Sequence, residues 1–413
     1  MNKIINDAYR TNLFYSLRRK SSKRICNITE LPVVSKEEIR DGYELLTNHI
    51  NSIEDRENII QSTTSGSTGM YLKVLWKKSD YFNSLFSVWF LRKKYYDIFP
   101  YSKLLYTFSG LYRDNNYERK KENVIIEDNR LGISTDVFNE HMLHEFYMII
   151  EKFEPEWIII QPSVGNILFE CIEKFGKKPF EKIKYIEYTG EYLEKELIKK
   201  TKDILNCDVG NLYGLTEVNQ IAFMCPYGNL HCMESNVYVE IINDDNENVP
   251  SGVEGEICVT SLTNTIMPFI RYKTGDRGRI TDTYKCPCGN KGKTIQILRG
   301  RTSEYVILEN GEKSSINIFF DVVQYINEEV GNCIKQFRII QEKGDDYKVI
   351  LVLNEGYFGW KDTIINSFLE QINTKGIKNA EWRFEFFSEY LPTLPSGKLS
   401  FFVQKKYDGP ELL

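Results

Sequence analysis

The stretch from Ile183 to Glu217, IKYIEYTGEYLEKELIKKTKDILNCDVGNLYGLTE, reads as a strand, a helix, a second strand and a polar turn. Ile183–Tyr188 and Cys207–Tyr213 are short apolar runs that predict strands. Between them, Glu194–Leu205 carries apolar residues at helical spacing. Strand, helix and strand in this order are typical of a largely parallel sheet covered by helices, so the stretch predicts an α/β fold.

The same alternation continues outward in both directions. Toward the N-terminus, Leu104–Phe108 and Trp157–Ile160 predict strands, and Thr135–Lys152 predicts a helix with one apolar face. Beyond Gly214 the pattern changes to short β-rich pieces separated by a polar turn at Asn243–Gly255. These pieces, Val237–Ile242 and Glu256–Thr260, predict a small barrel-like part or sheet.

A second change of pattern falls near Arg301. A hairpin signal at Tyr305–Gly311 is followed by a helix from Ser315, two strands, a helix from Trp360 and a strand at Trp382–Phe387. A chain of 413 residues usually needs more than one hydrophobic core. We therefore predict two domains: residues 1–301, built of layered α/β sheets with the barrel-like part, and residues 302–413, of α+β type.

Composition narrows the function classes. Hydrophobic residues make up 42% of the chain, and 53 Lys and Arg face 58 Asp and Glu for a formal charge of -5. We expect no nucleic-acid partner, because the one basic cluster, Arg18–Arg24, is better explained as a solvated helix face. No apolar run approaches the length of a membrane span and no signal peptide is evident, so we expect a cytoplasmic protein. The aromatic run Tyr81–Phe90 predicts a buried helix rather than an aromatic substrate pocket.

Two segments could hold parts of a nucleotide. Thr63–Gly69 contains only glycines and hydroxyl residues, and by itself fits a flexible linker and a phosphate-binding loop equally well. Asn211–Glu217 follows an apolar strand, at the edge where open α/β sheets bind ligands, and would present Tyr213, Thr216 and Glu217 together. Its simpler interpretation is a capped turn.

Two later segments also carry polar chemistry. Phe269–Asp276 ends in a carboxylate that could accept both hydroxyls of a ribose, or could form a salt-bridged turn with Arg277. Leu391–Lys398 is a Pro-rich loop whose lysine is either a solvated charge or a mobile cation delivered to an active site.

The order of these segments resembles the adenylate-forming enzymes, the superfamily of acyl-CoA synthetases, adenylation domains and luciferases. Tyr213-Gly-Leu-Thr216-Glu217 and Tyr272-Lys-Thr-Gly-Asp276 are similar to its adenine and ribose segments, and Gly300-Arg301 to its hinge. The short chain and Leu31-Pro-Val-Val-Ser-Lys36-Glu are similar to the branch of phenylacetate-CoA ligases and capsule-biosynthesis proteins of the CapK type. The resemblance implies that the small C-terminal domain is mobile.

The resemblance implies a role for each matching residue. Lys398 would bridge the substrate carboxylate and the α-phosphate, Glu217 would hold magnesium, and Thr216 would contact the α-phosphate. The remaining nucleotide-binding residues implied are Thr64, Ser65, Gly66, Ser67, Thr68 and Gly69 for phosphates, Gly190, Glu191, Tyr213 and Gly214 around the adenine, and Asp276 with Arg301 at the ribose.

The chain departs from the family pattern at two places. The family usually continues its phosphate loop with Pro and Lys, whereas here Met70-Tyr71-Leu72 precedes Lys73, which leaves the role of Lys73 open. The hinge position usually holds Asp or Lys and falls here on Ser303 or Glu304, which leaves the pivot unassigned.

The phrase C-P-x-G-N occurs twice, from Cys225 and from Cys286. Cys225, His231, Cys286 and Cys288 would form a closed tetrahedral set suited to structural zinc, with Cys232 as a possible replacement. Reduced, buried thiols are the alternative. Some members of the phenylacetate-CoA ligase branch carry zinc at such cysteines, so the resemblance favours a zinc knuckle within 225–288.

These observations predict an AMP-forming acid–thiol ligase. It would use ATP and Mg²⁺ to convert a small-molecule carboxylic acid to an acyl-adenylate, and then transfer the acyl group to coenzyme A or to the phosphopantetheine of an acyl carrier protein. The alternatives are transfer to an amine or hydroxyl, and an inactive nucleotide-binding scaffold. The presence of both Glu217 and Lys398 argues against the scaffold.

Overall fold

The computed structural model describes most of the chain, in two compact units. The first unit comprises Met1–Thr135 and His141–Leu298, and the second Asp136–Glu140 and Arg299–Leu413. The described residues are 2–18, 27–50, 58–64, 72–108, 112–113, 119–120, 123–134, 140–281, 286–301, 305–307, 313–343, 346–377, 380–389, 391 and 401–404.

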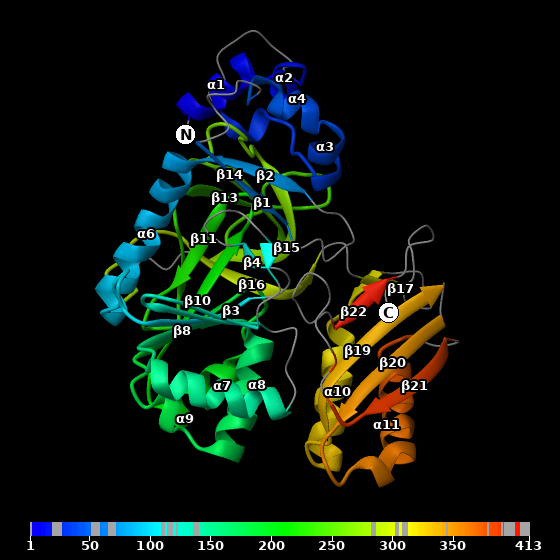
Figure 1. The fold of residues 1–413 in the computed structure, drawn as a ribbon. Coiled ribbons are helices and arrows are strands. Elements are labelled where there is room, and N and C mark those ends of the chain that lie inside the picture. The colour runs from blue at the N-terminus through cyan, green and yellow to red at the C-terminus, as the bar shows by residue number, and fades with distance from the viewer. Residues whose placement is uncertain are drawn as a thin grey trace. The chain divides into compact units, whose positions relative to one another are not determined.

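A twelve-stranded sheet forms the centre of the first unit (Figure 1), in the order β13-β14-β15-β16-β12-β11-β10-β9-β8-β3-β7-β6. Its strands are β3 (Leu104–Phe108), β6 (Val124–Glu127), β7 (Arg130–Ser134), β8 (Trp157–Ile160), β9 (Tyr185–Thr189), β10 (Asp208–Leu215), β11 (Asn219–Met224), β12 (Leu230–Cys232), β13 (Val237–Ile242), β14 (Gly255–Ser261), β15 (Tyr272–Thr281) and β16 (Thr294–Arg301). The short strands β4 (Tyr112–Arg113) and β5 (Arg119–Lys120) pair separately.

Five neighbouring strands, β10, β9, β8, β3 and β7, are parallel, as the alternating pattern predicts. Helices cover both faces because alternate side chains of each strand point to opposite sides. On β9, the Tyr185 ring stacks on Tyr96 of α6 (Lys78–Tyr96), with 4.0 Å between ring centroids. On the other face, the Tyr188 and Thr201 hydroxyls lie 2.8 Å apart, and Thr201 belongs to α9 (Lys195–Leu205).

The remaining helices of this unit form two groups. α7 (Glu140–Phe153) and α8 (Pro162–Phe175) lie together with α9 (Figure 1). The N-terminal group is α1 (Asn2–Thr11), α2 (Leu13–Ser16), α3 (Lys36–Asp41) and α4 (Tyr43–Thr47). The expected β-rich part joins the large sheet, where β10–β11, β13–β14 and β14–β15 pair antiparallel.

The aromatic run in α6 is helical, but its expected burial is only partly correct. Phe82, Phe86 and Phe90 are 63%, 74% and 57% exposed. The buried face instead carries Ser84, Val88, Arg92 and Tyr96. This orientation is explained by Arg92, whose guanidinium donates from Nε to Glu187 Oε2 at 2.9 Å and from a second nitrogen to Glu187 Oε1.

We expect Arg92→Leu to lower the thermal midpoint of unfolding of the first unit by about 5–10 °C. Glu187 is fully buried, so losing Arg92 leaves an unpaired charge in the core, which costs about 3–5 kcal/mol. For a unit of this size each kcal/mol corresponds to roughly 2 °C. The matched control is Arg10→Leu, because Arg10 pairs with Asp7 on the surface. Equal shifts in a calorimetric scan of the two variants would rule out this role for Arg92.

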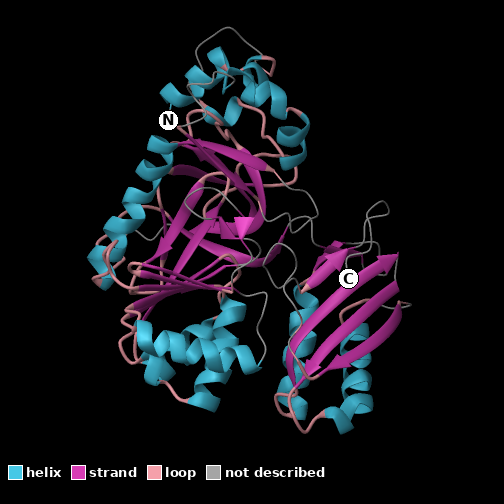
Figure 2. Ribbon diagram, viewed as in Figure 1, coloured by secondary structure: helices cyan, strands magenta, loops and turns pink. Residues whose placement is uncertain are grey.

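The second unit consists of a four-stranded sheet with two helices beside it (Figure 2). The sheet order is β21-β20-β19-β22, and its core contains buried residues of α10 and α11 such as Phe319 and Phe368. A separate hairpin pairs β17 with β18, as the sequence predicts. The elements are β17 (Tyr305–Ile307), β18 (Lys313–Ser315), α10 (Asn317–Val330), β19 (Ile334–Lys343), β20 (Asp346–Leu353), α11 (Lys361–Thr374), β21 (Glu381–Phe387) and β22 (Phe402–Gln404).

Within the described ranges, no helix combines the length and the apolar character needed to cross a bilayer.

Candidate active site

Two tyrosine–carboxylate hydrogen bonds join the predicted adenine and ribose segments. The Tyr213 hydroxyl donates to Asp276 Oδ2 at 2.9 Å, and the Tyr272 hydroxyl donates to Glu217 Oε1 at 2.9 Å. Each segment therefore holds the carboxylate of the other. Three of the residues singled out in the sequence, Tyr213, Glu217 and Asp276, are thus brought together.

The two tyrosine–carboxylate hydrogen bonds also indicate that the sheet is curved between β10 and β15. Three strands, β16, β12 and β11, lie between β15 and β10 in the sheet order, so β15 and β10 are four strand spacings apart. With neighbouring strands about 4.8 Å apart, β10 and β15 would be separated by about 19 Å in a flat sheet, too far for a tyrosine to reach a carboxylate. The sheet must therefore curl here, in the part predicted to be barrel-like.

Glu217 lies in the tight connection between β10 and β11. These strands pair antiparallel, with a bulge between Tyr213 and Gly214. A side chain at Gly214 would place its Cβ 2.6 Å from the carbonyl oxygen of Asn219, so the hairpin requires glycine there. The neighbouring residue Thr216 accepts a hydrogen bond at its carbonyl oxygen from Trp76 Nε1, at 3.3 Å.

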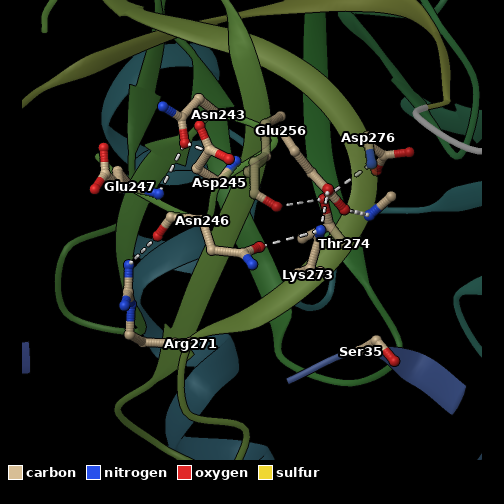
Figure 3. Close-up of polar contacts among 12 residues, drawn as sticks. Ser35, Asn243, Asp245, Asn246, Glu247, Glu256, Arg271, Lys273, Thr274 and Asp276 are labelled. Atoms are coloured by element: carbon tan, nitrogen blue, oxygen red, sulfur yellow. Dashed lines mark hydrogen bonds and ion pairs between the residues drawn. The ribbon is translucent and has the colours of Figure 1, made fainter. Parts of the chain in front are cut away.

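The ribose segment is fixed by side chains on both sides (Figure 3). Thr274 Oγ1 donates to the Ile257 carbonyl at 2.8 Å and accepts from the Asp276 backbone N–H at 3.0 Å. Glu256 accepts from the Gly275 backbone N–H at 3.1 Å and pairs with Lys273 Nζ at 3.0 Å. Gly275 has φ +79°, a conformation that favours glycine. The Asp276 carboxylate is therefore presented by a well-supported turn.

The strands on either side of the hydroxyl-rich segment pair with each other. β1 (Ile59–Thr63) pairs antiparallel with β2 (Lys73–Lys77). At the base of the loop the Thr64 backbone N–H donates to the Leu72 carbonyl, and the Leu72 N–H donates to Thr64 Oγ1, both at 2.9 Å. Thr64 and Leu72 are buried, and Lys73 is an exposed strand residue paired with Thr63.

The Glu191 carboxylate forms hydrogen bonds that the sequence does not predict. Its two carboxylate oxygens accept from the backbone N–H and the hydroxyl of Ser163, each at 2.9 Å. Ser163 lies in the first turn of α8, where a carboxylate is favoured by the unpaired N–H groups. Gly190, immediately before it, has φ +83° and turns the chain at the end of β9. Glu191 therefore anchors α8 beside the predicted adenine segment.

Several predicted site residues lie outside the described residues. These are Lys398 and the loop residues Ser65, Gly66, Ser67, Thr68 and Gly69. Ser303 and Glu304, the predicted pivot positions, are also outside them. Arg301 ends β16, but its side chain is not among the described parts.

Tyr272 forms a site contact to which the sequence analysis assigned no role. Tyr213 precedes Glu217 by four residues, and Tyr272 precedes Asp276 by the same interval. This repeated Tyr-x-x-x-acid pattern is the signal that could have identified it. The sequence does not reveal that the two hydroxyls cross over to the other segment's carboxylate.

The four predicted metal ligands form one cluster. Ligand atoms of Cys225, His231, Cys286 and Cys288 all lie within 4.8 Å of one another. The Cys225 and Cys286 sulfurs are 3.7 Å apart, and Cys288 Sγ is 3.3 Å from His231 Nε2. Tetrahedral zinc with Zn–S bonds of about 2.3 Å requires sulfurs roughly 3.8 Å apart, whereas a disulfide requires about 2.05 Å. The donor set therefore fits zinc. Cys232 is not part of this cluster, since it follows His231 on β12 and points to the opposite face.

The two C-P-x-G-N phrases adopt the same turn. The Gly228 N–H donates to the Cys225 carbonyl at 2.9 Å, and the Gly289 N–H donates to the Cys286 carbonyl at 3.0 Å. Both glycines are left-handed, with φ +79° and +80°. Burial opposes ionisation of Cys286, but hydrogen bonds from Cys288, His231 and Asn229 outweigh it and lower the pKa of this thiol to about 6. Such a thiol supplies the thiolate that a metal ligand requires.

The cluster lies where the described sheet has little backbone pairing, between β12 and β16. Among the described residues, β12 pairs with β16 at one position, His231 with Thr294. Cys225 and His231 belong to the β11–β12 side, while Cys286 and Cys288 belong to the segment leading into β16. A metal bound by all four would therefore cross-link the two halves of the sheet, one carrying Glu217 and the other Asp276.

Taken together, the parallel sheet and the two tyrosine–carboxylate hydrogen bonds beside it are typical of a nucleotide-binding α/β protein. A family model described as AMP-binding enzyme matches residues 18–267. This match covers more than half of the chain, so the protein belongs to the AMP-binding enzyme family.

Curated relatives narrow the comparison. A phenylacetate-coenzyme A ligase from Thermus thermophilus is 25% identical over 238 residues, which cover 55% of this chain and 52% of the relative. Protein CapK from Staphylococcus aureus is 23% identical over 397 residues, 92% of this chain and 80% of the relative. The chain thus aligns with only about half the length of that ligase.

Solved structures share the fold. A 2-hydroxyisobutyryl-CoA ligase in the postadenylation state, in complex with 2-HIB-AMP, superposes with a TM-score of 0.70 at 14% identity and covers 98% of this chain and 88% of its own. An anthranilate CoA ligase in complex with anthranoyl-AMP gives a TM-score of 0.56 at 15% identity, covering 83% and 66%. At these identities the likeness establishes the fold and confirms the predicted α/β class.

Proposed function

We propose that the protein activates a carboxylic acid with ATP, releasing pyrophosphate and forming an acyl-adenylate, and then transfers the acyl group to a thiol. The observation that carries the proposal is the crossed pair of bonds, Tyr213 to Asp276 and Tyr272 to Glu217. It holds the carboxylate of each segment against the tyrosine of the other, and the proposal gives these two carboxylates different tasks. Family membership and the names of the curated ligases support the same reaction.

In this proposal the two carboxylates bind different parts of the nucleotide. Asp276 accepts hydrogen bonds from the ribose hydroxyls, and the Tyr213 ring lies against the adenine. Glu217 and Thr216 lie toward the phosphates. Glu217 supplies the oxygen ligand that Mg²⁺ prefers, and its single held oxygen fits that task. When bound, magnesium neutralises charge on the phosphate oxygens.

The hairpin loop and Lys398 complete the site. A loop closed at its base by Thr64 and Leu72 can surround pyrophosphate with backbone N–H groups and hydroxyls. Lys398 would stabilise the charge that develops on the α-phosphate, and movement of the second unit would then remove it before the transfer step.

For the acceptor we favour coenzyme A over a carrier-protein thiol, an amine or a hydroxyl. The curated phenylacetate relatives are named as coenzyme A ligases. The alignments cover only about half of the length of those relatives, so coenzyme A as acceptor is part of the proposal. For the cysteine cluster we propose a structural zinc, because three thiolates and one imidazole leave no open coordination position.

The experiment is ATP–pyrophosphate exchange by the purified full chain, across a panel of aliphatic and aromatic acids. We expect exchange that depends on the acid and on Mg²⁺. The acid that gives the fastest exchange is then incubated with ATP and either coenzyme A or a simple amine, and the acylated product is identified by mass spectrometry. ATP binding without exchange for any acid would favour the nucleotide-binding scaffold.

A further inference from the structure

Tyr272 is anchored in the core of the first unit by contacts of both its ring and its backbone. It is 2% exposed, and its ring packs edge-on against Phe269 with 5.1 Å between centroids. Its backbone pairs with Val259 on β14 and forms a bridge with Val34 of the N-terminal segment. The position of its hydroxyl is therefore set by the core of the first unit.

Glu217 depends on this hydroxyl for its orientation. The side chain is buried, 5% exposed, and lies in the connection between β10 and β11 rather than in a strand. Oε1 accepts the Tyr272 hydroxyl at 2.9 Å. Over the described ranges, no hydrogen bond to Oε2 is found, so one oxygen is held by the protein while the other remains for a different partner.

The predicted ribose segment has a similar tyrosine–carboxylate hydrogen bond, but its carboxylate is also fixed through its own backbone. The Tyr213 hydroxyl donates to Asp276 Oδ2, but both residues are half-buried and the Asp276 backbone is fixed separately by Thr274. Each tyrosine thus donates to the carboxylate of the other segment. The two halves of the nucleotide site can be perturbed independently.

We propose that Tyr272 is a positioning residue for the cation half of the site, and that Tyr213 has this role for the ribose half. Tyr272 directs Glu217 so that Oε2 meets a divalent cation, while Tyr213 orients Asp276 toward the ribose hydroxyls. The inference rests on the proposed function. Outer partners of metal-binding side chains typically contribute 10–100-fold to metal affinity, which sets the size of the expected effect.

The test measures binding of ATP and AMP to the full chain by calorimetry over a series of Mg²⁺ concentrations. We expect Tyr272→Phe to raise the Mg²⁺ concentration for half-maximal ATP binding about tenfold, and to leave the Kd for AMP without metal within about twofold. Tyr213→Phe is the matched control. It should weaken AMP binding several-fold and leave the Mg²⁺ midpoint within about twofold.

The possible results distinguish failure of the Tyr272 inference from failure of the proposed function. An unchanged Mg²⁺ midpoint in Tyr272→Phe, or equal weakening of ATP and AMP, would overturn this inference and leave the proposed function intact. If the unaltered protein binds neither nucleotide, both fail. Should Tyr272→Phe not fold, Phe269→Leu replaces it, because Phe269 packs against the Tyr272 ring and the change leaves both carboxylates in place. It should raise the Mg²⁺ midpoint several-fold, and an unchanged midpoint would again overturn the inference.

Discussion

Lys398→Ala is expected to slow acid-dependent ATP–pyrophosphate exchange by about a hundredfold or more. Negative charge builds on the α-phosphate and the leaving pyrophosphate during attack by the carboxylate, and a fixed cation stabilises it. Removing one such group typically costs about 10²–10³ in rate. AMP binding should stay within about twofold, since in our proposal the lysine acts on the reacting phosphate rather than on the nucleoside.

The control for Lys398→Ala is Lys348→Ala. Lys348 is a lysine of β20 in the same unit, paired with Glu385 at 2.8 Å. The Lys348→Ala variant should exchange pyrophosphate at the rate of the unaltered protein. Exchange by Lys398→Ala at more than about half that rate would remove this lysine from the mechanism.

Replacing both Cys286 and Cys288 by serine is expected to abolish stoichiometric zinc and to lower the thermal midpoint of the first unit by about 5–10 °C. The variant keeps Cys225 and His231 but loses two of four ligands. With one described ladder pair between β12 and β16, we expect a metal at the cluster to contribute to the continuity of the sheet at this point. A stability loss of about 3–5 kcal/mol corresponds to this shift at roughly 2 °C per kcal/mol.

The metal prediction is checked by elemental analysis and calorimetry of the purified protein. The matched control is Cys171→Ala, a buried cysteine of α8 outside the cluster, which should retain one zinc per chain. If zinc cross-links the Glu217 and Asp276 halves as proposed, the double serine variant should also bind ATP more weakly. Less than about 0.2 zinc per chain in the unaltered protein would contradict the account of this cluster.

Much of the framework could be predicted from sequence because local pattern determines it. Leu104–Phe108 and Trp157–Ile160 coincide with β3 and β8, and the predicted helix Glu194–Leu205 differs from α9 by one residue. The cluster of three cysteines and one histidine was also predictable, because the C-P-x-G-N phrase occurs twice and His231 follows its first copy.

Other features depend on contacts distant in sequence. The apolar pattern of α6 predicts a helix but not which face is covered, and Arg92 turns toward Glu187, leaving Phe86 exposed. The bond from Tyr272 to Glu217 exists only because the sheet curls across its intervening strands. Glu191 bonds to Ser163, 28 residues earlier, which no local pattern encodes.

The central claim is that a carboxylate oxygen of the substrate attacks the α-phosphate of ATP. Once the exchange panel has identified an acid, the reaction is run with that acid labelled with ¹⁸O in its carboxylate, with coenzyme A as acceptor. The account predicts that AMP is released and that its phosphate carries one ¹⁸O atom from the acid. Formation of ADP, or of AMP without the label, would contradict it.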